Sequence, residues 1–224
     1  MLYIIGTPIG NLRDMSPRAI ELLKEADTIL MESPQDSLRL LQIFEIPKKP
    51  VIKYNDANAK QVIPKIREAL QKGGVALITS AGMPGVSDPG FHAVQVAREL
   101  HIEAQVIPGP SAVTSAIALS GMPIYDFAFV GFLPRTEGKL KKLIEEYKNR
   151  EQAVVFFESP FRIQKSMKIL ELVVPSAQVF LAKELTKKFE SSVYGIPKEV
   201  NEWLADKKEH TKGEFVGIIG FQLR

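Results

Sequence analysis

The sequence predicts an α/β protein of two domains, the first built on a parallel sheet flanked by helices and the second on a mixed sheet. Two observations predict this class. Short apolar runs alternate with amphipathic stretches along the chain, and the pattern restarts after the turn residues Gly121-Met122-Pro123. Strand, helix and strand in repeated order favour parallel strands covered by helices. We therefore expect an N-terminal α/β domain at residues 1–122 and a C-terminal α/β domain at residues 123–224.

In the first domain, strands are expected at Leu2–Ile5, Thr28–Met31, Val51–Ile52, Val75–Thr79 and Gln105–Ile107. Ser16 followed by Pro17 is a favourable helix start, because the serine can cap free N–H groups and proline suits the first turn. A second helix is expected at Ala59–Lys72, where Gly73-Gly74 supplies the stop. A third follows Gly90, and we expect Asp88 to cap it.

In the second domain, strands are expected at Phe127–Phe132, Ala153–Phe157, Gln178–Ala182, Phe189–Tyr194 and Phe215–Phe221. Helices are expected at Glu137–Arg150, Pro160–Val173 and Val200–Leu204. Trp203 is best explained as a core or dimer contact, with a stacking platform for bases as the alternative.

Composition excludes several classes of function. The 224 residues are 45% hydrophobic and 25% charged, as in an ordinary globular protein. The absence of cysteine excludes disulfides, thiolate metal sites and a cysteine nucleophile, and favours a cytoplasmic location. The three histidines lie too far apart in sequence for a local zinc motif, so no metal is expected. The uncharged stretch 104–125 is broken by prolines and glycines, so no membrane partner is expected.

The formal net charge of +3 is mild. It lies in the second half of the chain, where Lys139, Lys141 and Lys142 form one cluster and Lys187 and Lys188 another. These clusters permit a nucleic-acid partner, but solvated helix faces explain such clusters more often.

Three loops that follow predicted strands are rich in glycine, proline and small polar residues: residues 6–11, 80–90 and 108–112. Loops at the carboxyl ends of parallel strands meet at one edge of the sheet, where ligands bind. Each loop alone is explained by a tight turn, whereas three together favour a small-molecule site that bare backbone approaches closely. The sequence has no GxxxxGK[ST] motif, no GxGxxG spacing in the first loop and no GxSxG elbow, which disfavours phosphate-binding loops and serine hydrolases.

Seven motifs resemble the tetrapyrrole methylase superfamily, in order and through almost the whole chain. They are Gly6-Thr7-Pro8-Ile9-Gly10-Asn11-Leu12, Ala81-Gly82-x-Pro84-Gly85-x-Ser87-Asp88-Pro89-Gly90, Pro108-Gly109-Pro110-Ser111-Ala112, Gly131-Phe132-Leu133-Pro134, Phe157-Glu158-Ser159-Pro160-x-Arg162, Ala182-Lys183-Glu184-Leu185-Thr186-Lys187 and Lys212-Gly213-Glu214-Phe215. Members that modify tetrapyrroles typically carry a GxGxGD-type first loop. The first motif therefore resembles the branch that methylates ribose 2′-oxygens of small-subunit ribosomal RNA.

The resemblance implies a homodimeric methyltransferase that binds S-adenosylmethionine in a cleft between two α/β domains. By matching position, the cofactor would be lined by Pro8, Ser80, Ala81, Met83, Ser111, Ala112, Phe157, Glu158 and Ala182. A sulfonium carries its own leaving group, so the protein mainly has to orient and desolvate it, and no metal is needed. A hydroxyl acceptor also needs a proton acceptor, for which Glu32, Glu158 and Glu184 are the candidates. Each is equally well explained as the structural partner of a nearby base such as Arg162 or Lys187.

The chain departs from the RNA-type pattern on the substrate side. A Glu-Asp-Thr-Arg run is replaced by Glu32-Ser33-Pro34-Gln35, two histidines are replaced within residues 55–57, and a histidine is replaced by Phe161. Three hypotheses therefore stay open. The first is an RNA-type methyltransferase acting on small-subunit ribosomal RNA or a related substrate. The others are a catalytically impaired cofactor-binding or regulatory paralogue and a small-molecule, tetrapyrrole-type methyltransferase.

Overall fold

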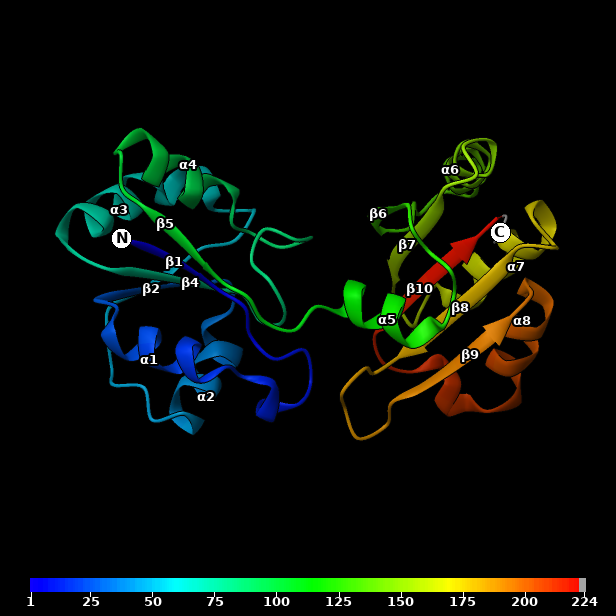
Figure 1. Cartoon of the computed structure of the whole chain (residues 1–224), viewed down its shortest axis with the longest axis horizontal. Helices are drawn as coiled ribbons and strands as arrows, with labels where there is room; N and C mark the ends of the chain where they lie inside the picture. The colour runs from blue at the N-terminus through cyan, green and yellow to red at the C-terminus, as the bar shows by residue number, and fades with distance from the viewer. Residues whose placement is uncertain (222–224) are drawn as a thin grey trace. The chain divides into compact units, whose positions relative to one another are not determined.

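The computed structural model describes residues 1–221 and, at Asp36, the backbone alone. The chain divides into two compact units, which meet in the sequence between Ser111 and Ala112 (Figure 1). Helix α5 (Ala112–Ser120) packs against strand β10 (Phe215–Gly220) and so belongs to the second unit. The boundary near residue 122 stays a prediction. The two α/β architectures expected from the sequence are confirmed.

The first unit holds a parallel sheet of five strands in the order β3-β2-β4-β1-β5. The strands are β1 (Leu2–Ile5), β2 (Thr28–Met31), β3 (Val51–Lys53), β4 (Val75–Ile78) and β5 (Ala104–Ile107). Helices α1 (Pro17–Glu25) and α2 (Pro34–Ile43) lie on one face, and α3 (Ala59–Lys72) and α4 (Phe91–Glu99) on the other (Figure 1). A short 3-10 helix, η1 (Leu12–Asp14), follows the first loop.

Local sequence explains where these helices begin and end. The Ser16 hydroxyl accepts a hydrogen bond from the Ala19 N–H at 3.1 Å, and Pro17 occupies the first turn of α1. Helix α3 ends at Gly73, as expected. Each face of the sheet buries its own apolar cluster, one against α1 and one against α3 and α4, so the inner strands β2, β4 and β1 are apolar on both faces.

The second unit holds a mixed sheet in the order β6-β7-β10-β8-β9, in which only the β6–β7 pair is parallel. Its strands are β6 (Phe127–Phe132), β7 (Ala153–Glu158), β8 (Gln178–Lys183), β9 (Ser191–Gly195) and β10. Its further helices are α6 (Glu137–Asn149), α7 (Ile163–Val173), α8 (Pro197–Asp206) and the 3-10 helix η2 (Lys208–Thr211). Gly217 on β10 is required by packing, because a Cβ there would lie 2.2 Å from Cζ of Phe156.

Several elements differ from the sequence expectation. Helix α2 was not predicted, and its N-cap residue Ser33 makes no side-chain hydrogen bond. Asp88 does not cap α4: the N-cap is Gly90, without a side-chain cap bond. Helix α7 begins at Ile163, because residues 159–162 form a turn in which the Arg162 and Ile163 N–H groups both donate to the Ser159 carbonyl. Strand β9 begins two residues later than expected, which leaves Phe189 in the preceding loop.

None of the helices within residues 1–221 is both long and apolar enough to cross a membrane.

Candidate active site

The three glycine- and proline-rich loops of the first unit come together. They follow β1, β4 and β5, which are neighbours in the sheet, so they leave it side by side. The loops after β1 and β4 are joined by an antiparallel bridge in which Thr7 N–H donates to the Gly82 carbonyl (2.9 Å) and Gly82 N–H to that of Thr7 (3.0 Å). The buried Thr7 hydroxyl also donates to the Thr79 carbonyl at 3.2 Å.

The loops after β1 and β5 cross backbone against backbone. A Cβ added to Gly6 would lie 2.7 Å from Cα of Gly109 and 2.6 Å from Sδ of Met83. A Cβ on Gly109 would lie 2.8 Å from the Gly6 backbone. Contacts under 3 Å are not tolerated, so both positions need glycine. This crossing brings the predicted cofactor residue Met83 against the first and third loops.

The other predicted residues of this unit lie around the same loops. Pro8 is buried beside the Thr7–Gly82 bridge, whereas Ser80 and Ala81 are exposed directly after β4. Ser111 is half-buried at the end of the third loop. The exposed backbone and small side chains leave room for a ligand to approach the sheet edge closely.

The loops of this crossing carry no positive charge, and three carboxyl groups lie near them. The loops at 6–11, 80–90 and 108–112 contain no lysine or arginine. Glu32 follows β2, and its Oε2 accepts a hydrogen bond from the Ser80 hydroxyl at 3.2 Å. Burial, assisted by the charges of Glu32 and Asp56, raises the pKa of Asp88 to about 6. Loops without cations, near three carboxyl groups, suit a positively charged ligand and disfavour a phosphate.

In the second unit, Glu158 ends β7 with its carboxylate fully buried. Its Oε1 pairs with the Arg162 guanidinium at 2.5 Å and accepts the Ser159 N–H at 2.7 Å, while its Oε2 accepts the Ser166 hydroxyl at 2.6 Å. Arg162 also donates to the Leu133 carbonyl at 3.1 Å. Through Arg162, Oε1 thus joins the segments that follow β6 and β7, while Oε2 holds the first turn of α7.

Glu184 follows β8 and is engaged in a similar way. Its Oε1 accepts the Glu214 N–H at 2.9 Å and the Lys187 ammonium at 3.0 Å. Burial opposes ionisation, but these donors outweigh it and lower the pKa of Glu184. Burial likewise opposes the charge of Lys187, but its pKa is raised by the carboxylates of Glu214 and Glu184. This network fixes the loop between β8 and β9.

Two further predicted positions lie on neighbouring strands of this sheet. Phe157 on β7 is half-buried and makes edge-to-face contacts with Phe129 and Phe132, with ring centroids 5.0 and 5.8 Å apart. Ala182 on β8 is fully buried, opposite Val216 of β10. Ala112 begins α5 and is half-buried.

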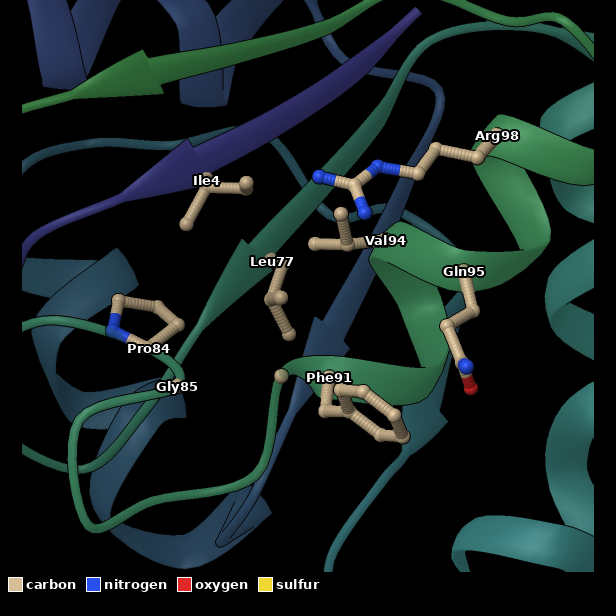
Figure 2. A pocket seen from close by; sticks show the side chains of 9 residues that line it. Ile4, Leu77, Pro84, Gly85, Phe91, Val94, Gln95 and Arg98 are labelled. Carbon is tan, nitrogen blue, oxygen red and sulfur yellow. The ribbon is translucent and has the colours of Figure 1, made fainter.

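A pocket of about 260 Å³ lies on the α4 side of the first sheet (Figure 2). Figure 2 shows the Arg98 side chain extending from α4 across the pocket towards Ile4 of β1, above Val94 and Leu77. Pro84, Gly85 and Gly90 form its remaining loop wall. None of the predicted cofactor residues lines this pocket, so it is separate from the loop crossing. Across residues 1–221, acidic and histidine side chains do not gather in a group that could hold a metal ion.

Comparison with known proteins decides the family. Residues 1–200 match the family described as Tetrapyrrole (Corrin/Porphyrin) Methylases. The chain belongs to this family. A relative from Thermotoga maritima named ribosomal RNA small subunit methyltransferase I is 42% identical over 187 residues, which are 83% of each protein. Relatives of the same name from Coprothermobacter proteolyticus and Bacillus subtilis are 39% and 33% identical over 98% of this chain, and over 97% and 74% of their own lengths.

Solved structures of methylase-fold proteins agree in fold. A diphthine synthase superposes with a TM-score of 0.76 over 100% of this chain and 92% of its own, at 14% identity. A uroporphyrin-III-C-methyltransferase from Thermus thermophilus gives 0.62 over 98% and 94%, at 16% identity. The resemblance drawn from the seven motifs is therefore confirmed, and this member of the methylase family is a methyltransferase.

Sequence reasoning missed two features of the site. The raised pKa of Asp88 depends on burial and on the carboxyl groups of Glu32 and Asp56, which follow two other strands and lie far from Asp88 in the sequence. The dual role of Arg162 was missed because its second acceptor, the Leu133 carbonyl, lies 29 residues away. The motif Glu158-Ser159-Pro160-x-Arg162 contained the only signal, a carboxylate and a guanidinium four residues apart.

Proposed function

We propose that this methylase-family chain is an S-adenosylmethionine-dependent methyltransferase that acts on the ribose 2′-oxygen of small-subunit ribosomal RNA. The cation-free crossing of three loops at Gly6, Gly82 and Gly109 is the observation that carries the cofactor assignment. The substrate assignment is supported by relatives named ribosomal RNA small subunit methyltransferase I that match 98% of this chain. We further propose that the protein is a cytoplasmic homodimer.

The proposed cofactor contacts are divided between the units. Those in the first unit are Pro8, Ser80, Ala81, Met83 and Ser111; those in the second are Ala112, Phe157, Glu158 and Ala182. When bound, S-adenosylmethionine supplies an activated methyl group together with its own leaving group. The protein then has to hold the acceptor oxygen in line and remove its proton. Carboxyl groups near the loops would complement the positive charge of the cofactor.

Among the three candidate proton acceptors, we propose Glu32. It stands at the carboxyl edge of the first sheet, and the Ser80 hydroxyl donates to one of its oxygens. Glu158 and Glu184 each pair with a cation, Arg162 and Lys187, and also accept uncharged donors, so we propose that these two position the loops of the second unit. Glu32 would accept the proton that the 2′-hydroxyl releases when its oxygen takes the methyl group from the sulfonium, whose sulfur keeps the electron pair of the broken bond.

A second candidate, a cofactor-binding paralogue with impaired catalysis, is favoured by the loop after β3. Asn55 and Ala57 stand where RNA-type relatives are expected to have two histidines, ahead of an asparagine that this chain keeps as Asn58. The side chains of Asn55 and Asn58 accept each other's backbone N–H groups at 3.1 and 2.8 Å, and the Asn58 amide donates to the Lys53 carbonyl. These groups stabilise the loop itself, which leaves fewer side chains there to bind substrate.

The deciding experiment uses the whole chain with methyl-labelled S-adenosylmethionine and small ribosomal subunits that lack the modification. We expect calorimetric binding of the cofactor, and label in a 2′-O-methyl nucleoside after digestion of the RNA. Cofactor binding without transfer would favour the impaired paralogue. Label only in a small-molecule fraction would favour the tetrapyrrole-type alternative, and failure to bind the cofactor or its demethylated product would refute the proposal.

A further inference from the structure

The carboxyl end of β6 lies at the same edge of the second sheet as the ends of β7 and β8. Strand pairing establishes this: Phe132 pairs with Phe157, Phe215 pairs with both Glu158 and Lys183, and Lys183 pairs with Ser191. The segments 133–136, 159–162, 184–190 and 212–214 therefore leave from one edge of the sheet.

Three phenylalanines lie at this edge and are strongly exposed. The exposed fraction is 58% for Phe132, 95% for Phe161 and 67% for Phe189. Phenyl rings are normally buried, so a group of three at one edge indicates a surface that another molecule covers. We call Phe132, Phe161 and Phe189 the aromatic edge.

The rings stand on fixed supports. The Phe161 N–H donates to the Ser159 hydroxyl at 3.3 Å, in the turn that the Glu158–Arg162 pair closes. Phe132 contacts the ring of Phe157. The loop of Phe189 is held by Lys187, whose ammonium pairs with both Glu184 and Glu214. Rigid supports reduce the ordering cost of binding.

Exposed cations lie in the segments at this edge of the sheet. Lys188 places its ammonium 5.6 Å from the centroid of Phe189. Arg135 lies in the segment after Phe132, and Lys212 precedes β10; both are exposed. Considering residues 1–221 only, none of these three cations is in an ion pair, so their charges are available to a partner.

We propose that the aromatic edge stacks unpaired bases of single-stranded RNA, while Arg135, Lys188 and Lys212 contact the phosphates between them. This inference rests on the proposed RNA substrate and assigns the surface that would hold it. Neighbouring strands are about 4.8 Å apart, so rings that follow β6, β7 and β8 span roughly 15 Å, enough for two to three nucleotides. Exposed rings together with cations outside ion pairs suit the bases and the phosphates of a single strand.

The test measures binding of a fluorescein-labelled, unstructured 12-nucleotide RNA to the full chain by anisotropy. We expect Phe161→Ala and Phe189→Ala each to weaken binding about ten-fold, the usual loss for one stacked base. Phe161→Trp should bind as the parent does, whereas Phe161→Leu should bind as weakly as Phe161→Ala, because leucine is apolar but has no π-face. Leu172→Ala, at a position on α7 that is 74% exposed, is the matched control and should leave binding unchanged.

The phosphate contacts have their own readout. Arg135→Ala combined with Lys188→Ala should reduce the slope of log affinity against log salt by roughly 1.4, about 0.7 for each lost contact to a single strand. An unchanged slope would overturn the assignment of these cations.

Other outcomes would overturn the aromatic assignment. If Phe161→Leu and the parent bind the RNA equally, apolar area at this position is sufficient and no base stacks on Phe161. A change of oligomeric state in Phe161→Ala, measured by light scattering, would indicate an interface between copies of this chain. If the parent protein does not bind the RNA, the proposal that the aromatic edge is an RNA-binding surface is wrong. Calorimetry with S-adenosylmethionine separates these failures from failure of the proposed function, because the cofactor should bind the parent and Phe161→Ala equally.

Discussion

Arg162 neutralises the fully buried carboxylate of Glu158 across 2.5 Å and donates a further hydrogen bond to the carbonyl of Leu133. One side chain therefore joins the segments that follow β6 and β7. These are the segments that lead from Phe132 and carry Phe161. The position of the aromatic edge consequently depends on a charge pair beneath it.

Removal of this ion pair should lower the stability of the folded protein. Arg162→Ala leaves the Glu158 charge buried without its partner, and we expect a loss of about 3 kcal/mol in the free energy of unfolding. Arg150→Ala is the matched control, because the Arg150–Glu146 pair is exposed and worth about 0.3–0.5 kcal/mol. Urea unfolding followed by circular dichroism measures both, and equal losses would show that the Glu158 pair is not special.

The crossing of Gly6 and Gly109 predicts a second effect. Gly109→Ala would place a methyl group 2.8 Å from the Gly6 backbone, so the loops must separate. We expect a loss of about 1–3 kcal/mol in stability and a clear loss of S-adenosylmethionine affinity. Gly138→Ala is the control: its Cβ meets nothing within 4 Å and lies in the first turn of α6, where alanine should be neutral or stabilising. If Gly109→Ala bound S-adenosylmethionine as tightly as the parent, the Gly6–Gly109 crossing would not be part of the cofactor site.

Asp88 predicts a dependence on pH. Its pKa of about 6 in the folded chain exceeds the ordinary 3.8, so the folded state binds more protons between these values. Stability therefore falls as pH rises from about 4 to 6, and the cost persists above that range. Asp88→Asn removes the cost and should stabilise the protein by about 1 kcal/mol at pH 7, a figure reduced for solvent screening, with little gain at pH 4.

A carbon-13 titration of the Asp88 carboxyl checks the same claim directly. The midpoint should lie near pH 6 and should move down in Glu32→Gln, which removes one of the charges that raise it. A midpoint near 4 in the parent would contradict the burial that the structure gives this side chain.

Glu32 as proton acceptor predicts a loss of turnover with retention of cofactor. Glu32→Gln keeps the size of the side chain and its bond to Ser80 but cannot take a proton, so methyl transfer should fall by about 10²–10⁴. Calorimetric affinity for S-adenosylmethionine should change little. Glu184→Gln serves as comparison, because its carboxylate fixes a loop and its loss should reduce stability more than turnover. If Glu32→Gln transferred methyl groups at the parental rate, Glu32 would not be the proton acceptor.

Much of the fold could be predicted because its signals are local. Apolar runs set the strands, and Ser16-Pro17 and Gly73 set helix ends. The glycines at 6, 82 and 109 identified loops whose convergence the structure then displayed. Helix α2 was missed although its signals are local: Ser33-Pro34 repeats the serine–proline start of α1, and Leu38 and Leu41 stand at helical spacing.

The parts of the site that escaped prediction depend on contacts between distant residues. Asp88 owes its raised pKa to burial and to carboxyl groups after β2 and β3. The sequence also suggested that Glu158, Glu184 and Glu32 were equivalent candidates, whereas the structure pairs the first two with the cations of Arg162 and Lys187. Side-chain availability depends on tertiary packing and is not encoded in any single motif.

The Gly6–Gly109 crossing has a consequence for engineering. Gly6 and Gly109 meet through main-chain atoms, so their contact does not constrain the side chains of exposed positions nearby. A library that randomises positions 9, 10 and 86, while retaining both glycines, Met83, the Asn11 cap and Ser87 with its φ of +66°, should keep the fold and vary acceptor preference.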